Sequence, residues 1–557
     1  MKLSELNFDV CPPVLTAESM RALDALEKNT RAKAAGMPKI LSGALSLKSL
    51  EIAAGYGLMK NAGRALYNRV VDLLSEYAPY SSEKPNVAVF VGGGNNGGDG
   101  LVLAKLLLDA EISCIVFSLA PEEKFRNEAA LALEDFLKVG GALNVIENPA
   151  ISFAKFVEGK VPEFSLIVDC MLGNGASGDL KPAFAQMASL INKWKIPVLS
   201  ADAPTGYDSK EHCVRENCIV AKETMLFGMP RIDAYVKNGG PVFGKVQIAR
   251  LDYAESNIAS FAEKIFWATD ALLPLLLPER NDWGDKREQG SAVIVAGSAN
   301  MPGAAALCTG AALRSGAGLV TLATPKSVFP IVAGKLSEPV FLSLECVSEN
   351  LERHGESFSI SDIPCVLNSL RHANAFAIGP GLSMNAETQI AIVQLLKQVK
   401  LPTVIDADAL NAMAAVHINK DLWNAFEMPA ILTPHIREYA RLFGELPLDA
   451  TLIPAELREK SRECGKVIVL KGAPTFVALP NGIVYLVPCA NSGMAKGGSG
   501  DVLTGILVAL LSQGMAVEEA AVLGVLIHQR AGEIAKKKLG AFSMLPSDVI
   551  ECLAGAF

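Results

Sequence analysis

The cysteines of this chain lack the spacing of a metal or redox site. Eleven cysteines are spread over 557 residues, and no pair has the CxxC separation. The nearest pair, Cys213 and Cys218, stands alone. We therefore expect free thiols in a reducing compartment, with neither disulfides nor a zinc site.

Long hydrophobic runs and an excess of positive charge are also missing. The first residues, MKLSELNFDV, hold no apolar core of signal-peptide length. The longest apolar runs, such as 271–277 and 506–511, fall far short of the roughly 20 residues that span a bilayer. The net charge of −8 argues against nucleic acid or an anionic membrane as a partner. We expect a cytoplasmic protein, in which a local basic pocket for a phosphorylated small molecule remains possible.

The order of apolar and helical segments predicts two α/β domains. A chain of this length suggests roughly two to four domains. In the first half, strands are expected at 86–91, 113–119, 165–169 and 197–201, with helices at 16–29, 101–110 and 127–139. Such alternation is typical of a doubly wound parallel sheet of the Rossmann-like kind.

The second half repeats the alternation without repeating the sequence. Strands are expected at 291–296, 318–323, 375–378, 402–406, 430–432 and 466–470, a hairpin at 474–486 and a long helix at 518–538. Residues 252–278 look like a connector with the boundary near 255–265. The predicted domains are therefore 1–255 and 265–557.

A glycine-rich segment, GGGNNGGDG at 92–100, lies between a predicted strand and a predicted helix. Its glycines allow a ligand to approach the backbone closely, and the helix adds its positive N-terminal end. An anionic ligand such as a diphosphate is therefore expected. The alternative, a tight turn alone, needs only one or two glycines.

Two aspartates follow further strands of the first half. Asp169 precedes a second glycine-rich segment, and Asp202 lies in SADAPTG. The carboxyl ends of parallel strands share one edge of the sheet, so both aspartates could face the first loop. One could act as a base and the other could hold a cation. Taken alone, each could equally be a turn-forming residue.

These segments, with LMKNAGRAL, AKETMLFGMPR and GKVQIARLD, resemble the NAD(P)H-hydrate epimerase domain over roughly 10–250. The resemblance implies interconversion of the R and S forms of the hydrated cofactors NADHX and NADPHX at C6. Asp202 would be the acid/base residue, and Asn96, Asp169 and Thr205 would ligate potassium. The hydrate would be held by Asn95, Asn96, Gly97, Gly98, Asp99, Gly173, Asn174, Gly175, Ala176, Ser177, Gly178 and Asp179.

The first half departs from the family pattern at three places. Thr205 replaces the usual Ser but keeps a hydroxyl oxygen. Lys60 stands where the family usually has Glu, and an insert at about 42–56 could alter the lid over the site or form a surface excursion.

In the second half, the strongest motif is AKGGSGDVL at 495–503, which leads into an apolar helix. Small residues at a helix start build an anion site, and Asp501, at or near the N-cap, is placed to deprotonate a hydroxyl that attacks a phosphate. An Asp that merely caps the helix would not explain the glycines. Lys471 could meet phosphates as a point charge.

This motif, with VAGSANMPGAAAL, AIGPGL, VIDADALNAM, ILTPHIREYARL and VIVLKGAPT, resembles the ribokinase-like NAD(P)H-hydrate dehydratase domain over roughly 265–557. The resemblance implies dehydration of the S hydrate with ADP or ATP and Mg²⁺, and Asp501 as the base. Ala304, Gly381, His435 and Asp501 would contact the hydrate, and Lys471, Gly472, Ala473, Pro474, Thr475 and Gly500 the nucleotide. Relatives suggest a homo-oligomer. Two departures are Asp285-Lys286-Arg287 for His-Lys-Gly and Lys496 for Thr.

Two other functions compete with this interpretation. A ribokinase-like vitamin or sugar kinase would share the second fold, with the first domain as a non-catalytic binding module. It would transfer phosphate stably to an alcohol, whereas the repair enzyme would release phosphate and NADH. A purely non-catalytic role for the first domain would tolerate loss of Asp169 or Asp202, and both are present.

Overall fold

The computed structural model describes residues 3, 7–41, 46–77, 85–158, 161–237, 239–346, 356–418 and 420–557. It divides into two compact units, Pro13–Glu263 and Lys264–Phe557, the second of which includes Met1–Pro12. The domain boundaries predicted from the sequence assign residues 1–12 to the first domain. They group with the second unit because Trp267 N donates to Pro12 O at 2.9 Å and Thr269 Oγ1 donates to Val10 O at 2.7 Å.

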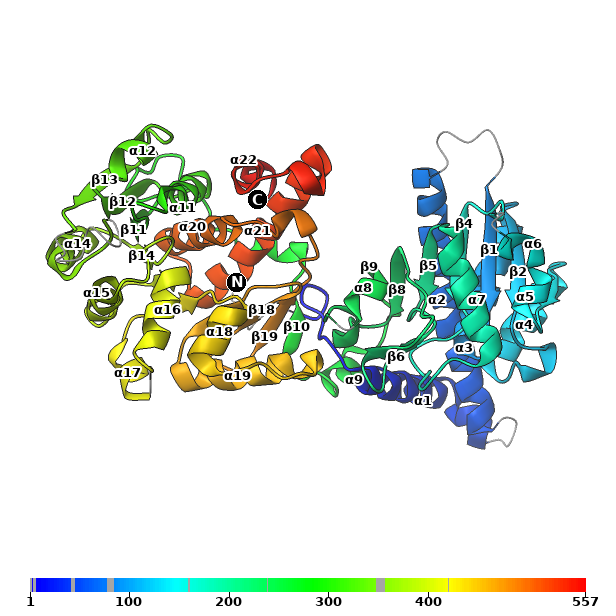
Figure 1. Ribbon diagram of the computed structural model, residues 1–557. Helices are drawn as coiled ribbons and strands as arrows, with labels where there is room; N and C mark the ends of the chain where they lie inside the picture. The colour runs from blue at the N-terminus through cyan, green and yellow to red at the C-terminus, as the bar shows by residue number, and fades with distance from the viewer. Residues whose placement is uncertain are drawn as a thin grey trace. The chain divides into compact units, whose positions relative to one another are not determined.

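The first unit is built on a parallel sheet covered by helices (Figure 1). Within the described residues the sheet has seven strands in the order β3-β2-β1-β4-β5-β8-β9. The strands are β1 (Asn86–Val91), β2 (Ser113–Ser118), β3 (Leu143–Val145), β4 (Leu166–Cys170), β5 (Val198–Ala201), β8 (Glu223–Phe227) and β9 (Lys245–Ala249), with a small ribbon of β6 (Tyr207–Asp208) and β7 (Cys213–Val214). The helices are α1 (Ala17–Leu41), α2 (Leu47–Tyr77), α3 (Asn95–Asp109), α4 (Glu128–Lys138), α5 (Pro149–Ser152), α6 (Ala154–Val157), α7 (Pro182–Trp194), α8 (Gly240–Phe243) and α9 (Glu255–Ala259).

Both faces of the central strand β1 are covered. Helix α3 packs on β1, β2 and β4 and against α2 and α4. On the other face, Phe90 belongs to a buried cluster with Met187 and Trp194 of α7. A strand buried on both faces reads as a continuous apolar run, which explains the sequence NVAVFV.

The second unit has a larger mixed sheet. In the part of the chain that is described, its ten strands run in the order β10-β19-β18-β17-β16-β15-β14-β11-β12-β13, with β18 antiparallel to both neighbours. The strands are β10 (Ile265–Trp267), β11 (Ser291–Val295), β12 (Leu319–Pro325), β13 (Val340–Leu344), β14 (Ala375–Ile378), β15 (Thr403–Ile405), β16 (Ala430–Leu432), β17 (Val467–Leu470), β18 (Thr475–Ala478) and β19 (Val484–Val487). The helices are α10 (Leu273–Leu276), α11 (Pro302–Arg314), α12 (Phe329–Ala333), α14 (Ile363–Leu370), α15 (Ala386–Leu396), α16 (Ala407–Ala415), α17 (Lys420–Ala425), α18 (Ile436–Phe443), α19 (Ile453–Cys464), α20 (Ser499–Ser512), α21 (Val517–Ser543) and α22 (Pro546–Glu551).

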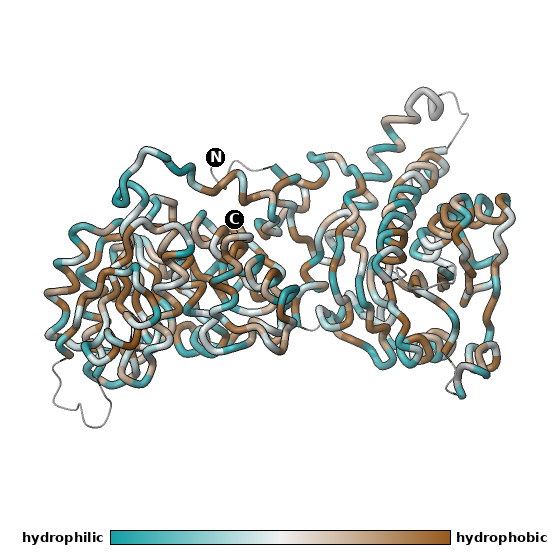
Figure 2. Tube along the Cα trace, turned by 90° about the horizontal axis from the view of Figure 1, so that it is seen from above, coloured by the Kyte–Doolittle hydropathy of each residue, from teal (hydrophilic) through white to brown (hydrophobic). Residues whose placement is uncertain are grey.

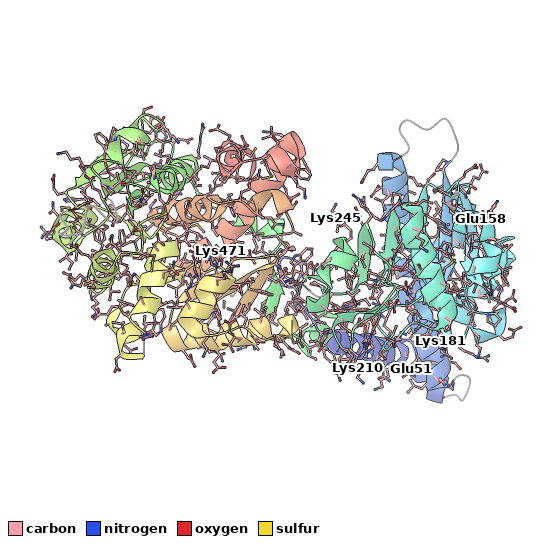
Figure 3. The ribbon with its side chains drawn as sticks, viewed as in Figure 1. Glu51, Glu158, Lys181, Lys210, Lys245 and Lys471 are labelled. Atoms are coloured by element: carbon pink, nitrogen blue, oxygen red, sulfur yellow. The ribbon has the colours of Figure 1, made fainter. Side chains whose placement is uncertain are left out.

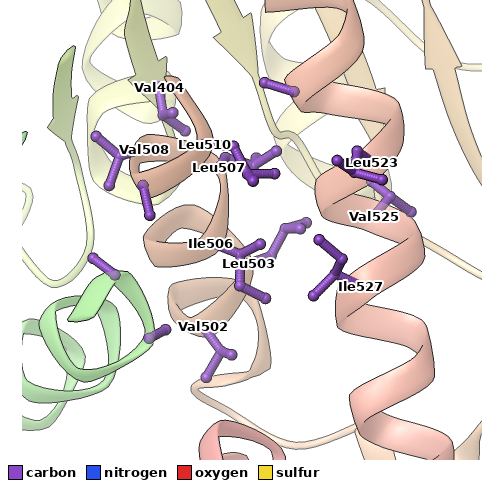
Figure 4. Close-up of a cluster of buried hydrophobic side chains, with 14 of the residues drawn as sticks. Val404, Val502, Leu503, Ile506, Leu507, Val508, Leu510, Leu523, Val525 and Ile527 are labelled. Carbon is purple, nitrogen blue, oxygen red and sulfur yellow. The ribbon is translucent and has the colours of Figure 1, made fainter. Parts of the chain in front are cut away.

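The core of the second unit is centred on helix α20, which packs against α11 and α21. Leu503, Ile506 and Leu507 of α20 meet Leu523 and Ile527 of α21 in this cluster (Figure 4). A Cβ at Gly505 would lie 2.2 Å from Cys308 O of α11, so the two helices could not pack this closely with a larger residue there. Hydrophobic stretches run through the interior of each unit (Figure 2).

The predicted two-domain α/β class is confirmed, and the predicted central strands lie within a residue or two of the observed ones. The edge strands β3, β10 and β13 were not predicted. Strand β10 lies inside the segment interpreted as a connector, and it pairs with β19 in parallel. Within the described residues, no helix combines the length and the hydrophobicity needed to cross a bilayer.

Candidate active sites

A cavity of ≈ 480 Å³ lies at the carboxyl ends of β1, β4 and β5 in the first unit. Segments 93–96 and 171–176 line it together with Asp202, and α1 and α2 add residues that include Asp24 and Met59. The strand ends at which the sequence analysis expected a binding site therefore lie around one cavity. Its wall combines backbone, carboxyl groups and apolar side chains.

The first glycine-rich segment is partly helical, which corrects the expected loop. Helix α3 begins at Asn95, with Gly94 as its N-cap. A Cβ at Gly97 would lie 1.8 Å from Gly92 O, and one at Gly100 would lie 2.8 Å from the Cys170 Cβ. These glycines let the helix start directly on the sheet. The first N–H groups of α3, which have no intrahelical acceptor, are thereby held at the cavity.

Asp169 is a fully buried carboxylate with a dense set of hydrogen bonds. Thr205 donates from its hydroxyl at 2.7 Å and from its N–H at 2.9 Å, Ser200 Oγ donates at 3.0 Å and Met171 N at 3.2 Å. Burial raises the pKa of Asp169 and these hydrogen bonds oppose the rise. Nearby, both polar atoms of the Asn96 side chain are buried without a hydrogen-bond partner among the described residues.

Asp202 is held by a buried arginine. Arg231, 1% exposed, donates to Asp202 Oδ1 at 2.6 Å and to its carbonyl oxygen at 3.1 Å. Asn174 N donates to Asp202 Oδ2 at 2.8 Å. The backbone of Asp202 is left-handed, with φ 62°, a conformation that Asp tolerates better than most residues. The carboxyl group is therefore fixed in orientation at the cavity wall.

The second glycine-rich segment contributes only its first half to the cavity. Gly173, Asn174, Gly175 and Ala176 line it. The side chain of Asp179 is 93% exposed and lies 4.0 Å from Arg215, and Gly178 N donates to Asp208. Of the first segment, Asn95, Asn96 and Asp99 line the cavity, and Gly97 and Gly98 are buried in the first turn of α3.

The insert near 42–56 falls partly outside the described residues, since 42–45 are not described. Its remaining part belongs mainly to the start of α2 and brings Gly55 to the cavity wall. Tyr56 donates to Asp135 at 2.7 Å, and the ammonium of Lys60 lies 4.9 Å from the centre of the Tyr56 ring. The insert therefore takes part in the wall of the site, and Lys60 packs on it.

In the second unit, Lys471 directly follows strand β17, and its ammonium group lies beside the first turn of helix α20. Its ammonium is 2.7 Å from Asp406 Oδ1, whose other oxygen accepts from Thr504 Oγ1 at 2.7 Å. A Cβ at Gly500 would lie 3.2 Å from Lys471 Nζ. Lys471 lies in the interior part of the second unit's ribbon, where it is labelled in Figure 3. A cation is thus placed at a helix N-terminus bordered by glycine, which favours an anion.

Asp501 is the third residue of α20 rather than its N-cap, which is Gly498 with φ 102°. Burial raises the pKa of Asp501 to about 7; Asp406 adds to the rise and Lys471 opposes it. A carboxyl group with such a pKa can take up a proton near neutral pH. Perturbed carboxyl groups of this kind concentrate at functional sites.

The other residues expected at the second site lie on neighbouring segments. His435 caps α18, where its Nδ1 accepts from Arg437 N and Glu438 N at 3.0 and 3.2 Å, and it forms a parallel bridge with Lys471. A Cβ at Gly381 would lie 2.8 Å from the Ala304 Cβ, so these two residues are adjacent. Thr475 Oγ1 donates to Gly472 O at 3.0 Å, which closes the turn of the KGAPT segment.

The two departures in this half have structural explanations. Lys496 donates to the carbonyls of Phe542 and Met544 at 2.9 and 2.5 Å, so it stabilises the end of α21. Asp285 accepts from the N–H groups of Arg287 and Glu288 at 2.7 and 3.1 Å. The Asp285-Lys286-Arg287 segment is therefore a local turn.

Sequence reasoning assigned no role to Arg231, Asp24 or His528. Arg231 stands in the quoted motif AKETMLFGMPR, which gave its only signal. Asp24 lies four residues after Met20, on the same face of α1, so a carboxyl group on an apolar face was the available clue. His528 of α21 is half-buried, hydrogen-bonds the Ser499 backbone, and has its pKa lowered by burial to about 4.

Comparison with known proteins places these two units in one family. Residues 55–232 match the family model described as YjeF-related protein N-terminus, and residues 292–554 match that of NAD(P)H-hydrate dehydratase. The bifunctional NAD(P)H-hydrate repair enzyme of Moorella thermoacetica is 34% identical over 89% of this chain and 91% of its own. The chain belongs to the family of bifunctional NAD(P)H-hydrate repair enzymes.

Two further similarities accompany this one. The repair enzyme of Thermofilum pendens is 31% identical over 89% of this chain and 91% of its own. A solved ADP/ATP-dependent NAD(P)H-hydrate dehydratase from Bacillus subtilis, crystallised with ATP and Mg²⁺, is 29% identical with a TM-score of 0.43 and covers 52% of this chain and 96% of its own. The function expected from the sequence, an epimerase and a dehydratase for hydrated nicotinamide cofactor, is confirmed, and the kinase alternative is not favoured.

Proposed function

We propose that each unit of this repair enzyme carries one of the two activities at the site described above. The first unit, predicted as domain 1–255, epimerises NADHX and NADPHX at C6. The second, predicted as domain 265–557, dehydrates the S form with ADP or ATP. The observation that carries the proposal is shared by both units: a helix N-terminus bordered by glycine lies beside an aspartate, Asp202 in one and Asp501 in the other.

In the first unit, Asp202 moves the proton. Its contacts with Arg231 and Asn174 fix the carboxyl group at the wall of the cavity. Carboxylate oxygens have spare lone pairs after accepting one hydrogen bond each, so Asp202 can still accept a proton during the reaction. The N-terminal turn of α3 and residues 173–176 hold the hydrate. Residues 177–179, predicted as part of this set, lie outside the observed lining.

Potassium is the proposed ion of this unit. Asn96, Asp169 and Thr205 offer amide, carboxylate and hydroxyl oxygens, which suit a hard cation. The amide of Asn96 is buried and has no hydrogen-bond partner among the described residues. Because buried polar atoms normally have a partner, this supports Asn96 as a ligand of the ion. When bound, the ion would supply positive charge beside the N-terminal turn of α3, to which Asn96 belongs.

In the second unit, Asp501 takes the proton of the C6 hydroxyl as that oxygen attacks the terminal phosphate of the nucleotide. The C6–O bond then breaks with inorganic phosphate as the leaving group, C5 loses a proton, and the electrons of the broken C5–H bond restore the C5=C6 double bond of the nicotinamide ring. A pKa of about 7 leaves a large fraction of Asp501 ionised near neutral pH, as a general base requires.

The nucleotide is held by residues 471–475 and by Gly500, with Mg²⁺ on its phosphates. Lys471 supplies the positive charge, and the N-terminus of α20 supplies N–H donors. Ala304, Gly381 and His435 complete the hydrate side of the site. The pairing of His435 with Lys471 across neighbouring strand ends supports one common site for the two substrates.

The cellular compartment and the oligomeric state of the protein are further parts of the proposal. All eleven cysteines are free thiols, which supports a reducing, cytoplasmic location. The homo-oligomer suggested by the resemblance stays a prediction.

The test is recovery of NADH from a mixture of R and S hydrates by the purified protein, with ADP or ATP, Mg²⁺ and potassium. Full recovery at a rate above the spontaneous epimerisation is expected. Recovery that stops at the S fraction would contradict the role of the first unit. Stable phosphorylation of an added alcohol, without NADH formation, would contradict the role of the second.

A further inference from the structure

Besides Asp202 and Asp99, a third carboxyl group, that of Asp24, lines the cavity of the first unit. Asp24 lines the same cavity as Asp202, but it comes from helix α1, whereas Asp202 follows strand β5. Tyr253 donates a hydrogen bond to Asp24 Oδ1. Among the contacts of the described residues no hydrogen bond engages Oδ2, so the lone pairs of this oxygen are not used by them.

Epimerisation at C6 requires two proton transfers. As the C6–O bond breaks, the N1 lone pair forms a C6=N1 bond, and the departing hydroxyl takes up a proton and leaves as water. A second water then attacks C6 from the other face of the ring and loses a proton. One water leaves and one enters, and no electrons are gained or lost. Two acid/base groups, one for each face, accomplish this without moving.

We infer that Asp24 is the second acid/base residue of the epimerase site and acts together with Asp202. The inference rests on the proposed function of the first unit. Asp24 donates its proton to the departing hydroxyl, and Asp202, paired with Arg231, accepts a proton from the incoming water. The reverse reaction exchanges the two roles. Tyr253 is a positioning residue that holds Asp24 by Oδ1 and leaves Oδ2 to carry the proton.

The surroundings of Asp24 agree with a proton donor. Burial raises the pKa of Asp24 to about 6, and Asp202 adds to the rise. The hydrogen bond from Tyr253 opposes it. The titratable and charged groups around Asp24 are Arg21 and Lys28 on α1, Asp99 on α3, Asp202, Arg231 and Tyr253. Below about pH 6 Asp24 therefore carries a proton.

The experiment follows conversion of purified R hydrate to the S form without nucleotide, in ¹⁸O-labelled water and from pH 5 to pH 8, with spontaneous conversion subtracted. The variants are D24N, Y253F and, as a matched control, E18Q, an exposed position on the same helix. Dehydration of S hydrate with nucleotide is measured for each variant as a check that the second unit is intact.

We expect D24N to lower the conversion rate by roughly 10²-fold and E18Q to leave it unchanged. In the parent protein the rate should fall as the pH rises above about 6. In Y253F this fall should move to higher pH, because a hydrogen bond that lowers the pKa of Asp24 has been removed. The S product should carry ¹⁸O.

Conversion by D24N at the parental rate, a fall above pH 6 that persists in D24N, or an S product without ¹⁸O would each overturn the role of Asp24. A parent protein that performs no R-to-S conversion would instead overturn the proposed function of the first unit. The two failures are therefore distinguishable.

Discussion

Replacement of Asp501 by Asn should separate the stability of the second unit from its activity. A rise of the Asp501 pKa from an ordinary 3.8 to about 7 corresponds to about 4 kcal/mol, at about 1.36 kcal/mol per unit. This free energy opposes folding, because the ionised form is less favourable in the folded state. The side chain is only partly buried, so solvent screening reduces the effect, and we expect D501N to raise the free energy of unfolding by about 1–2 kcal/mol at pH 8.

The pH dependence gives the sign of this effect. The unfolded carboxyl group ionises near pH 4 and the folded one near pH 7, so the cost grows between these values and is fully present above pH 7. The gain in D501N should therefore be absent at pH 4 and greatest at pH 8, where the unfolding temperature should rise by roughly 2–5 °C. Calorimetry of the intact chain measures it, with D282N, an exposed aspartate, as the control.

The same variant should lose dehydration activity. Asn keeps the shape of the side chain but cannot take up the hydroxyl proton, so NADH formation from S hydrate should fall by roughly 10²-fold or more. The reasoning is refuted if D501N is destabilised at pH 8, or if it folds and still dehydrates the S hydrate at a near-normal rate.

Three further outcomes are expected. D202A should abolish R-to-S conversion and leave S dehydration intact, which the mixed-hydrate assay shows as a burst of NADH followed only by the spontaneous rate; a fast second phase would contradict the assignment. N96A should raise the potassium concentration needed for half-maximal epimerisation, and an unchanged potassium dependence would remove Asn96 from the ion site. K471Q should raise the pKa of Asp501 further, because Lys471 lowers it. The dehydration rate, which should rise with pH through about 7 in the parent protein, should therefore rise at a higher pH in K471Q. A rate that still rises at pH 7 in the variant would contradict this coupling.

The fold was predictable where strands are buried on both faces. The run NVAVFV of β1 is apolar because helices cover both sides of the sheet, and the same reasoning found β11 and β14. The edge strands β10 and β13 include partly exposed residues, and their apolar runs, IFW and VFL, are only three residues long. Runs this short do not by themselves indicate a strand. The sequence placed the start of α3 six residues too late because glycine is a poor helix former, and only the close contacts of Gly97 and Gly100 show why it is used there.

The sequence singled out candidate residues where a motif marks a strand end, as at Asp169 and Asp202, or a helix start, as at Asp501. The partners of these groups come from distant segments and have no local signal. Arg231 reaches Asp202 across 29 positions, and Thr504 reaches Asp406 across 98. Likewise, the sequence shows Lys496 only as a departure from the family pattern. Its structural role depends on the distant carbonyls of Phe542 and Met544, which accept hydrogen bonds from its ammonium group.

The surroundings of Asp202 and Asp501 differ in how a neighbouring cation is placed, and this difference fits the proposed chemistry of the two sites. Asp202 is bonded directly to the buried Arg231, which fixes its orientation. Such a group is suited to act on one defined face of a substrate. In the second unit Lys471 donates its hydrogen bond to Asp406 instead. Its ammonium group therefore acts on Asp501 only through longer-range electrostatics, and the pKa of Asp501 stays at about 7. A base that must take a proton as a phosphate arrives gains from this arrangement, because the cation stays available to the phosphate while the carboxyl group remains basic.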